Sequence, residues 1–182
     1  MNRSRRHQRI DRLGAQLGRE LSTHTIMFHQ TVADCLGVAP TDHKCLGFIA
    51  DSDHPVTAGE LATLTGLTTG AITGVLDRLE SAGLARRERD PGDRRRVVVT
   101  AAATARDRVW PLFEGVARAS AKLATRYSDH ELEVIERYVI DSIEMMKEET
   151  KRLREAQTAQ LSSSNSSSSG GPSRVDGRKA SR

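Results

Sequence analysis

Two short helices separated by a glycine, with a basic hairpin directly after them, constrain the fold of this chain more than any other feature. Residues 57–60 read Thr-Ala-Gly-Glu, a capping box in which the Thr57 hydroxyl and the Glu60 carboxylate satisfy backbone N–H groups at a helix start. Gly66 then offers the backbone freedom of a tight turn, and Thr68 can cap a second helix. The spacing predicts a helix-turn-helix over residues 57–83.

The second of these helices is amphipathic. Its apolar residues recur at i, i+3, i+4 and i+7 as Ile72, Val75, Leu76 and Leu79. The opposite face carries Gly70, Thr73, Gly74, Asp77 and Arg78. Gly83 is expected to close the helix and Leu84 to return the chain to the core. One face is therefore predicted to pack inward, and the other is left free.

The next segment, residues 85–100, is named the wing here. It places six arginines against Glu88, Asp90 and Asp93, for a formal charge of +3, and both of its ends have strand character. Alone, such a segment is more typical of a solvated hairpin. Directly after a helix-turn-helix, it predicts a winged helix-turn-helix whose basic tip can enter a DNA groove.

Positive charge is concentrated at three places. The first ten residues carry +4, the wing +3 and residues 161–182 another +3, whereas the whole chain of 182 residues carries only +4. The rest is therefore net negative, which favours local phosphate contacts over a uniformly basic surface. Residues 1–9 are expected to be a flexible basic segment, and the serine-rich residues 161–182 a disordered tail.

The remaining segments have helical periodicity. Helices are predicted over residues 10–36, 41–50 with Thr41 as cap, 101–127 with an interruption or bend at Pro111, and 128–157 after a second capping box. The expected fold is mainly α with one small β-hairpin, and residues 10–160 form its domain. The winged helix occupies residues 41–100, so the apolar stripes of residues 10–36 and 101–157 need another surface. A homodimer is favoured over a monomer in which these helices fold back.

The helix-turn-helix and wing together resemble a known family. The motifs are Asp-Arg-Leu-Glu at 77–80, Gly-Leu at 83–84, Arg-Asp-Pro-Gly-Asp-Arg-Arg-Arg at 89–96 and Val-Val-Val-Thr at 97–100. They resemble the MarR family of bacterial transcriptional regulators, and the helical layout extends the resemblance to residues 9–160. The resemblance implies a homodimer that binds a palindromic operator through the second helix and the wing. It also implies release by a small anionic or phenolic ligand, or by an oxidant.

Eight residues are predicted to serve DNA binding: Thr68, Thr69, Thr73, Arg78, Asp93, Arg94, Arg95 and Arg96. Arg94 and Arg95 are expected in a flanking minor groove, with Asp93 bracing an arginine as an ion pair. The threonines can donate to phosphates or base edges, or serve as caps. Arg78 is placed for a phosphate contact. Related proteins often carry a longer residue where Gly74 stands, so one base reader is expected to be missing.

Family ligands lie where the dimer helices meet the winged helix. In this chain that junction corresponds to His24, Phe28, His29, His43, Phe48 and Trp110. Imidazoles beside aromatic rings can hold an aromatic carboxylate. The same residues can also simply fill the helix junction.

Other chemistries have weaker support. Cys35 and Cys45 form no Cys-x-x-Cys motif, so a zinc site is not indicated, and inert thiols are favoured over oxidant sensing. No motif of an enzyme or cofactor site occurs, and no apolar run approaches membrane length, so a cytoplasmic protein without cofactor is expected. A winged helix that binds protein instead of DNA is disfavoured, because protein interface cores are depleted of charge.

Overall fold

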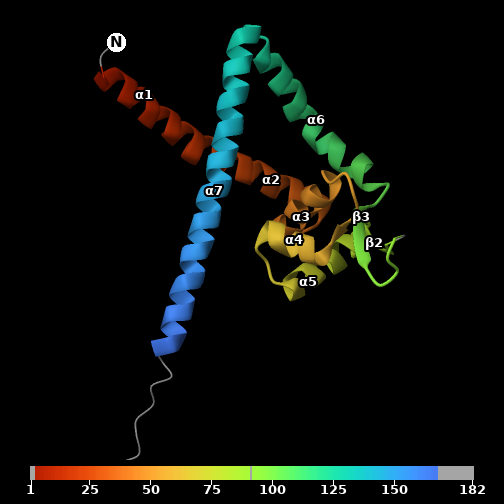
Figure 1. The fold of residues 1–182 in the computed structure, drawn as a ribbon. Helices are drawn as coiled ribbons and strands as arrows, with labels where there is room; N and C mark the ends of the chain where they lie inside the picture. Colours follow the sequence, from red (N-terminus) through yellow and green to blue (C-terminus); the bar gives the residue numbers. More distant parts are fainter. Residues whose placement is uncertain (1–2, 91, 168–182) are drawn as a thin grey trace, which may run out of the picture. The chain divides into compact units, whose positions relative to one another are not determined.

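The computed structural model describes residues 3–90 and 92–167 and has the expected winged helix-turn-helix architecture (Figure 1). The elements follow in the order α1 (Arg3–Ala15), η1 (Gln16–Leu21, a π-helical turn), α2 (Ser22–Leu36), α3 (Pro40–Ala50), β1 (Val56–Thr57), α4 (Ala58–Thr65), α5 (Thr69–Ser81), β2 (Ala85–Arg89), β3 (Val97–Ala101), α6 (Ala105–Ala124) and α7 (Asp129–Ser167). The chain divides into two compact units, residues 1–119 and 120–182. Within the described residues, no helix combines the length and apolarity needed to cross a membrane.

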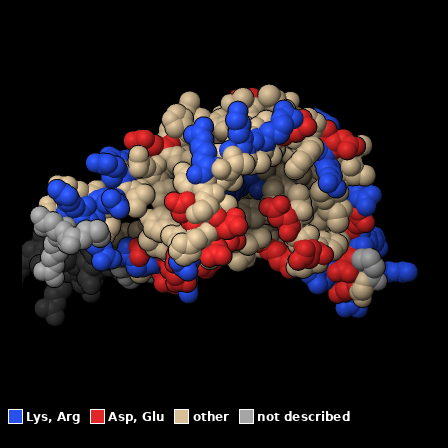
Figure 2. Space-filling view, turned by 90° about the horizontal axis from the view of Figure 1, so that it is seen from above, with Lys and Arg blue, Asp and Glu red and all other residues tan. Residues whose placement is uncertain are grey.

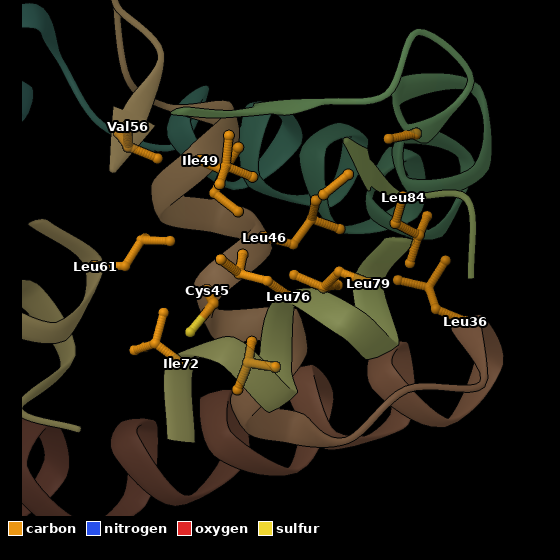
Figure 3. Close-up of a cluster of buried hydrophobic side chains, with 14 of the residues drawn as sticks. Leu36, Cys45, Leu46, Ile49, Val56, Leu61, Ile72, Leu76, Leu79 and Leu84 are labelled. Atoms are coloured by element: carbon orange, nitrogen blue, oxygen red, sulfur yellow. The ribbon is translucent and has the colours of Figure 1, made fainter. Parts of the chain in front are cut away.

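The core of the first unit lies among α3, α4, α5 and the sheet (Figure 3). The predicted stripe of α5 is confirmed, since all four of its apolar side chains are buried. They meet Leu46 and Ile49 from α3, Leu61 from α4 and Leu84, which directly precedes the wing. Burial of each leucine or isoleucine side chain stabilises the fold by about 1.5–3 kcal/mol relative to leaving it exposed to water. This packing fixes which face of α5 remains outside.

The sheet has one strand more than the sequence suggested. Its order is β1-β3-β2, all antiparallel, with Arg89 opposite Val97 in the hairpin and Val56 opposite Val99 at the other edge. Two residues are too few to show a period, so β1 has no recognisable pattern in the sequence. By pairing with β3, β1 ties the start of α4 to the base of the wing.

Local caps define the helix-turn-helix as predicted. Thr57 accepts the Glu60 N–H at 3.2 Å and donates its own N–H to the Glu60 carboxylate at 2.6 Å, which completes the capping box. Gly66 takes a left-handed conformation (φ 76°) after α4. Thr68 accepts the N–H of Ala71 at 3.2 Å and so caps α5.

The predicted cap of α3 was wrong. The helix begins at Pro40 after the N-cap Ala39, and Thr41 lies inside its first turn. The Ala39 N–H donates to the carboxylate of Asp42 at 3.2 Å. Proline at the first helical position has the required φ and forfeits no hydrogen bond there, so the N-cap lies two residues earlier than predicted.

The N-terminal helix begins earlier than expected. It starts at Arg3, where a flexible segment was predicted, and continues through the π-helical turn into α2. Arginine and glutamine are good helix formers, and each residue added to an existing helix gains a backbone bond at little cost. The start of the helix was therefore predicted too late, because a polar, basic composition is also typical of a flexible segment.

The C-terminal helices also differ at their ends. Residues 101–104 complete β3 and a turn, so α6 starts at Ala105, and Pro111 lies within the helix without ending it. A proline there removes one backbone bond, and the rest of the helix keeps its own. The capping box before α7 is confirmed, with the Ser128 N–H donating to Glu131 at 2.9 Å. α7 extends to Ser167, past residue 161, and residues 168–182 of the predicted tail lie outside the described residues.

Candidate nucleic-acid interface

The outer face of α5 is polar and accessible. Thr68, Thr69 and Thr73 are all exposed. The Thr68 hydroxyl accepts the capping N–H, and the Thr73 hydroxyl donates to the carbonyl of Thr69 at 3.0 Å. Among the described residues, the Thr69 hydroxyl has no hydrogen bond. Two of the three threonines thus have a local structural role, and all three present a hydroxyl at the surface.

The tip of the wing is organised by two aspartates. The Asp90 carboxylate accepts the Gly92 N–H at 2.8 Å, and the Asp93 carboxylate accepts the Arg95 N–H at 3.0 Å. Asp93 therefore braces the backbone of the turn, which differs from the expected ion pair with an arginine side chain. Of these two aspartates, Asp90 is the one with an arginine side chain nearby, 3.8 Å from Nη1 of Arg96.

The arginine side chains at the tip of the wing are exposed to solvent. Arg94, Arg95 and Arg96 are exposed, and the first two have no ion-pair partner among the described residues. The guanidinium groups of Arg94 and Arg95 are free to meet an anion, and the bonds at Asp90 and Asp93 hold the backbone that carries them.

Arg87, which the sequence pattern does not single out, joins the wing to α5. Its Nη2 lies 2.8 Å from Asp77 and donates to the Thr73 carbonyl at 3.1 Å, while its Nη1 pairs with Glu80. Its backbone N–H also donates to Glu80 at 2.7 Å. These bonds from one strand residue to successive turns of α5 fix the helix and the wing as one body.

Arg78 forms an ion pair that the sequence did not predict. Its Nε and Nη2 donate to the two carboxylate oxygens of Asp42, at 2.8 and 2.7 Å. The Asp42 side chain is fully buried, whereas that of Arg78 is 55% exposed. Hydrogen bonding to this carboxylate raises the pKa of Arg78 above its ordinary value. The pair connects the first turn of α3 to α5.

The residues expected to bind an effector are only partly brought together. Phe28 and His29 of α2, His43 of α3 and Phe113 of α6 form one ring cluster, in which Phe28 meets Phe113 edge to face at 5.4 Å. Nδ1 of His29 lies 3.1 Å from Nε2 of His43. Phe113 was missed because its helical stripe did not distinguish it from other core residues.

The other three predicted residues lie outside this cluster. His24 is exposed, and the Trp110 side chain is largely exposed at 57%. Phe48 packs against the hydrophobic core, with Nζ of Lys44 5.6 Å from its ring centre. Helical spacing places residues on a face but does not say which neighbouring element covers them, so the sequence could not separate these three residues from the ring cluster.

The two thiols differ in environment. Cys35 is exposed, whereas Cys45 is buried in the core and makes no disulfide. Burial, followed by the nearby Asp42 carboxylate, raises the pKa of the Cys45 thiol. A raised pKa disfavours the reactive thiolate, so Cys45 is a packing residue.

Charged side chains of both signs lie on the surface. On the face that Figure 2 displays, acidic side chains lie between the basic ones. The wing, with its three exposed arginines in a row, is the kind of local basic feature that contacts phosphates.

Comparison with known proteins agrees with this geometry. The model of the MarR family matches residues 36–96. YcgE of Bacillus subtilis (strain 168), an uncharacterised HTH-type transcriptional regulator, is 40% identical over 146 residues, which cover 80% of this chain and 94% of YcgE.

Two solved structures have a similar fold. A mutant of MepR from a multidrug resistant clinical isolate of S. aureus is 18% identical, with a TM-score of 0.61 over 71% of this chain and 94% of that chain. FabT of Streptococcus pneumoniae, solved in complex with DNA, is also 18% identical, with a TM-score of 0.59 over 78% of this chain and 98% of the FabT chain. At this identity the likeness concerns the fold alone.

Proposed function

The chain belongs to the MarR family of helix-turn-helix transcriptional regulators, and on that basis we propose that it is a sequence-specific repressor. As proposed, it binds a pseudo-palindromic operator as a homodimer and leaves the DNA when a small anionic or phenolic effector binds. Family membership places the chain among regulators rather than enzymes.

The observation that carries the proposal is the fixed pairing of α5 with the wing. Arg87 holds the two together through Thr73, Asp77 and Glu80. The polar face of α5 is suited to a major groove, and the arginine tip to the adjacent minor groove. A rigid connection between two groove-reading elements fits duplex DNA, which presents its grooves at fixed spacing.

A homodimer is supported by the exposed apolar stripe of α7. Its side chains are 41–59% exposed and fall on one helical face: Ile135, Val139, Ile143 and Met146. The opposite face is charged and consists of Arg137, Asp141, Glu144 and Glu148. A helix with this asymmetry needs a partner surface, and two-fold pairing of identical chains supplies one.

Dimerisation sets the form of the operator. Two copies of α5 related by a two-fold axis reach successive major grooves when they lie about 34 Å apart. The operator is then expected to have two inverted half-sites about one helical turn apart.

The wing arginines provide the test of DNA binding. Arg94→Ala and Arg95→Ala are each expected to weaken binding to the DNA flanking the gene of this protein. Each should also reduce the slope of log K against log salt by about 1 if its guanidinium pairs with one phosphate. Fluorescence anisotropy over a salt series measures both quantities. Arg106→Ala is the matched control, because it removes one exposed arginine from α6.

Unchanged affinity in both wing variants would remove the wing from DNA binding. Failure of the unaltered protein to bind any duplex would instead favour a winged helix that binds protein.

The effector part of the proposal rests on the cluster of Phe28, His29, His43 and Phe113. Its rings offer faces for stacking, and its imidazole N–H groups can donate hydrogen bonds to a carboxylate. Within the described residues, Nδ1 of His43 is buried without a hydrogen-bond partner. A buried polar atom of this kind can be satisfied by a ligand group.

Release by a ligand can be tested with salicylate-like acids. Such an acid is expected to weaken operator binding of the unaltered protein, and His29→Ala is expected to reduce that sensitivity at least several-fold. His24→Ala is the control, since His24 is exposed on the same helix and outside the ring cluster. Release by peroxide that Cys35→Ser abolishes would favour the oxidant-sensing alternative, because Cys35 is the exposed thiol.

A further inference from the structure

The buried carboxylate of Asp42 is fully committed to three donors. It accepts Nε and Nη2 of Arg78 and the backbone N–H of Ala39, at 2.8, 2.7 and 3.2 Å. Since the side chain has no exposed surface, it is held in one position by the first turn of α3. Its geometry is that of a fixed support for the guanidinium group.

The Arg78 side chain reaches this support from the surface of α5. A guanidinium group has five N–H donors, and Asp42 takes two of them. Nη1 has no partner among the described residues, and the side chain as a whole is 55% exposed. One edge of the guanidinium is therefore anchored, and the other edge is available to a ligand.

Gly74 explains how Arg78 can take this position. It lies one turn before Arg78 on α5, and a Cβ atom added there would lie 3.4 Å from Nη1 of Arg78. The guanidinium therefore lies directly against the helix at residue 74. The free edge of Arg78 thus lies over the outer surface of α5, on the same helix as Thr69 and Thr73.

We infer that Asp42 is a positioning residue for DNA binding, which orients Arg78 so that its free Nη1 edge contacts a backbone phosphate beside α5. The inference rests on the proposed DNA binding through α5. A guanidinium held at one edge loses less side-chain freedom when it meets a phosphate, and its fork suits two phosphate oxygens. The absence of a side chain at Gly74 then leaves room for the Arg78 guanidinium. This accounts for a glycine at the position where a base-contacting side chain was expected to be missing.

A purely structural role makes a different prediction. Asp42 would then hold α3 to α5, and its removal would change stability without changing phosphate contacts. Charge alone makes a third prediction, because removal of a carboxylate near the DNA side should strengthen binding to polyanionic DNA.

The test uses Asp42→Asn, Arg78→Gln and the double variant in the full-length protein. Each is compared with the unaltered protein by thermal unfolding and by operator affinity over a salt series. Arg78→Gln leaves a buried carboxylate unpaired and can unfold, whereas the double variant replaces the ion pair by two neutral amides. The double variant is therefore expected to fold, and its DNA binding can be measured even if Arg78→Gln alone unfolds.

We expect Arg78→Gln and the double variant to bind about ten-fold more weakly, with the salt slope reduced by about 1 because one phosphate is no longer neutralised. Asp42→Asn alone should also weaken binding, although it removes a negative charge, and it should add nothing once Arg78 is Gln. An unchanged salt slope in the folded double variant would overturn the inference, as would stronger binding by Asp42→Asn. If these outcomes appear while Arg94→Ala still weakens binding, the proposed function stands and only the role of Asp42 fails.

Discussion

His43 is a buried histidine in an unfavourable setting for positive charge. Only 8% of the residue is exposed, in the first turns of α3. Burial lowers its pKa, and so do the nearby His29 and Lys44. The folded protein consequently binds a proton at His43 less readily than the unfolded chain does.

This difference predicts a pH-dependent stability. An unfolded histidine titrates near pH 6.5, so stability should be full above about that pH and should fall as the pH drops below it, toward the lowered folded pKa. Thermal midpoints at about pH 7.5, 6.5 and 5.5 measure the decrease. His43→Phe should remove most of this dependence, whereas His130→Gln, at an exposed position of α7, should keep it. Equal decreases in the unaltered protein and His43→Phe would contradict the prediction.

The pairing of Arg78 shows why single residues are hard to assign from sequence. Its position on the outer face of α5 was predicted correctly, and it is exposed. Its partner Asp42 lies 36 residues away in another helix, so no local spacing connects them. An exposed arginine and a buried aspartate look unrelated until α3 and α5 are packed together.

At the scale of elements, the bounds of α4 and α5 and the start of α7 followed from local chemistry. The capping boxes at Thr57 and Ser128 and the left-handed turn at Gly66 were predicted and are present. These signals act within four residues, so the sequence contains them completely. β1 and the start of α1 were not predicted, because strand pairing determines the first and helix propagation determines the second.

The turn between α5 and the wing offers a test of this local control. Gly83 has φ 66°, and an added Cβ there would meet nothing within 4 Å, so Gly83→Ala introduces only backbone strain. We expect it to lower the free energy of unfolding by about 1–2 kcal/mol.

Gly47 is the matched control. It lies inside α3 with an ordinary helical backbone and equally open space. Gly47→Ala should raise the free energy of unfolding by about 0.5–1 kcal/mol, because alanine is the better helix former. Urea unfolding measures both changes, and a shift of both variants in the same direction would contradict the argument.

At the scale of the whole molecule, the proposed homodimer is the property most open to test. Val139→Glu places a carboxylate in the apolar stripe of α7. Burying an unpaired charge costs several kcal/mol, so the dimer dissociation constant should rise by at least about a hundred-fold.

Arg137→Gln makes the same change in net charge on the charged face of α7 and should leave the dimer intact. Light scattering at micromolar concentration distinguishes the two results. A monomer already in the unaltered protein, or a dimer unaffected by Val139→Glu, would show that this stripe is not the interface.

The winged helix-turn-helix, the buried stripe of α5 and the arginine tip of the wing could all be predicted from the order of residues. Each rests on interactions between residues close in the chain: caps, helical periodicity and turn chemistry. The roles that depend on distant partners became visible only in three dimensions. Folding pairs Arg78 with Asp42, joins Arg87 to Asp77 and Glu80, and gathers His29 and His43 with Phe113. Pattern and propensity act locally, whereas ion pairs and ring contacts form only after packing has brought separate elements together.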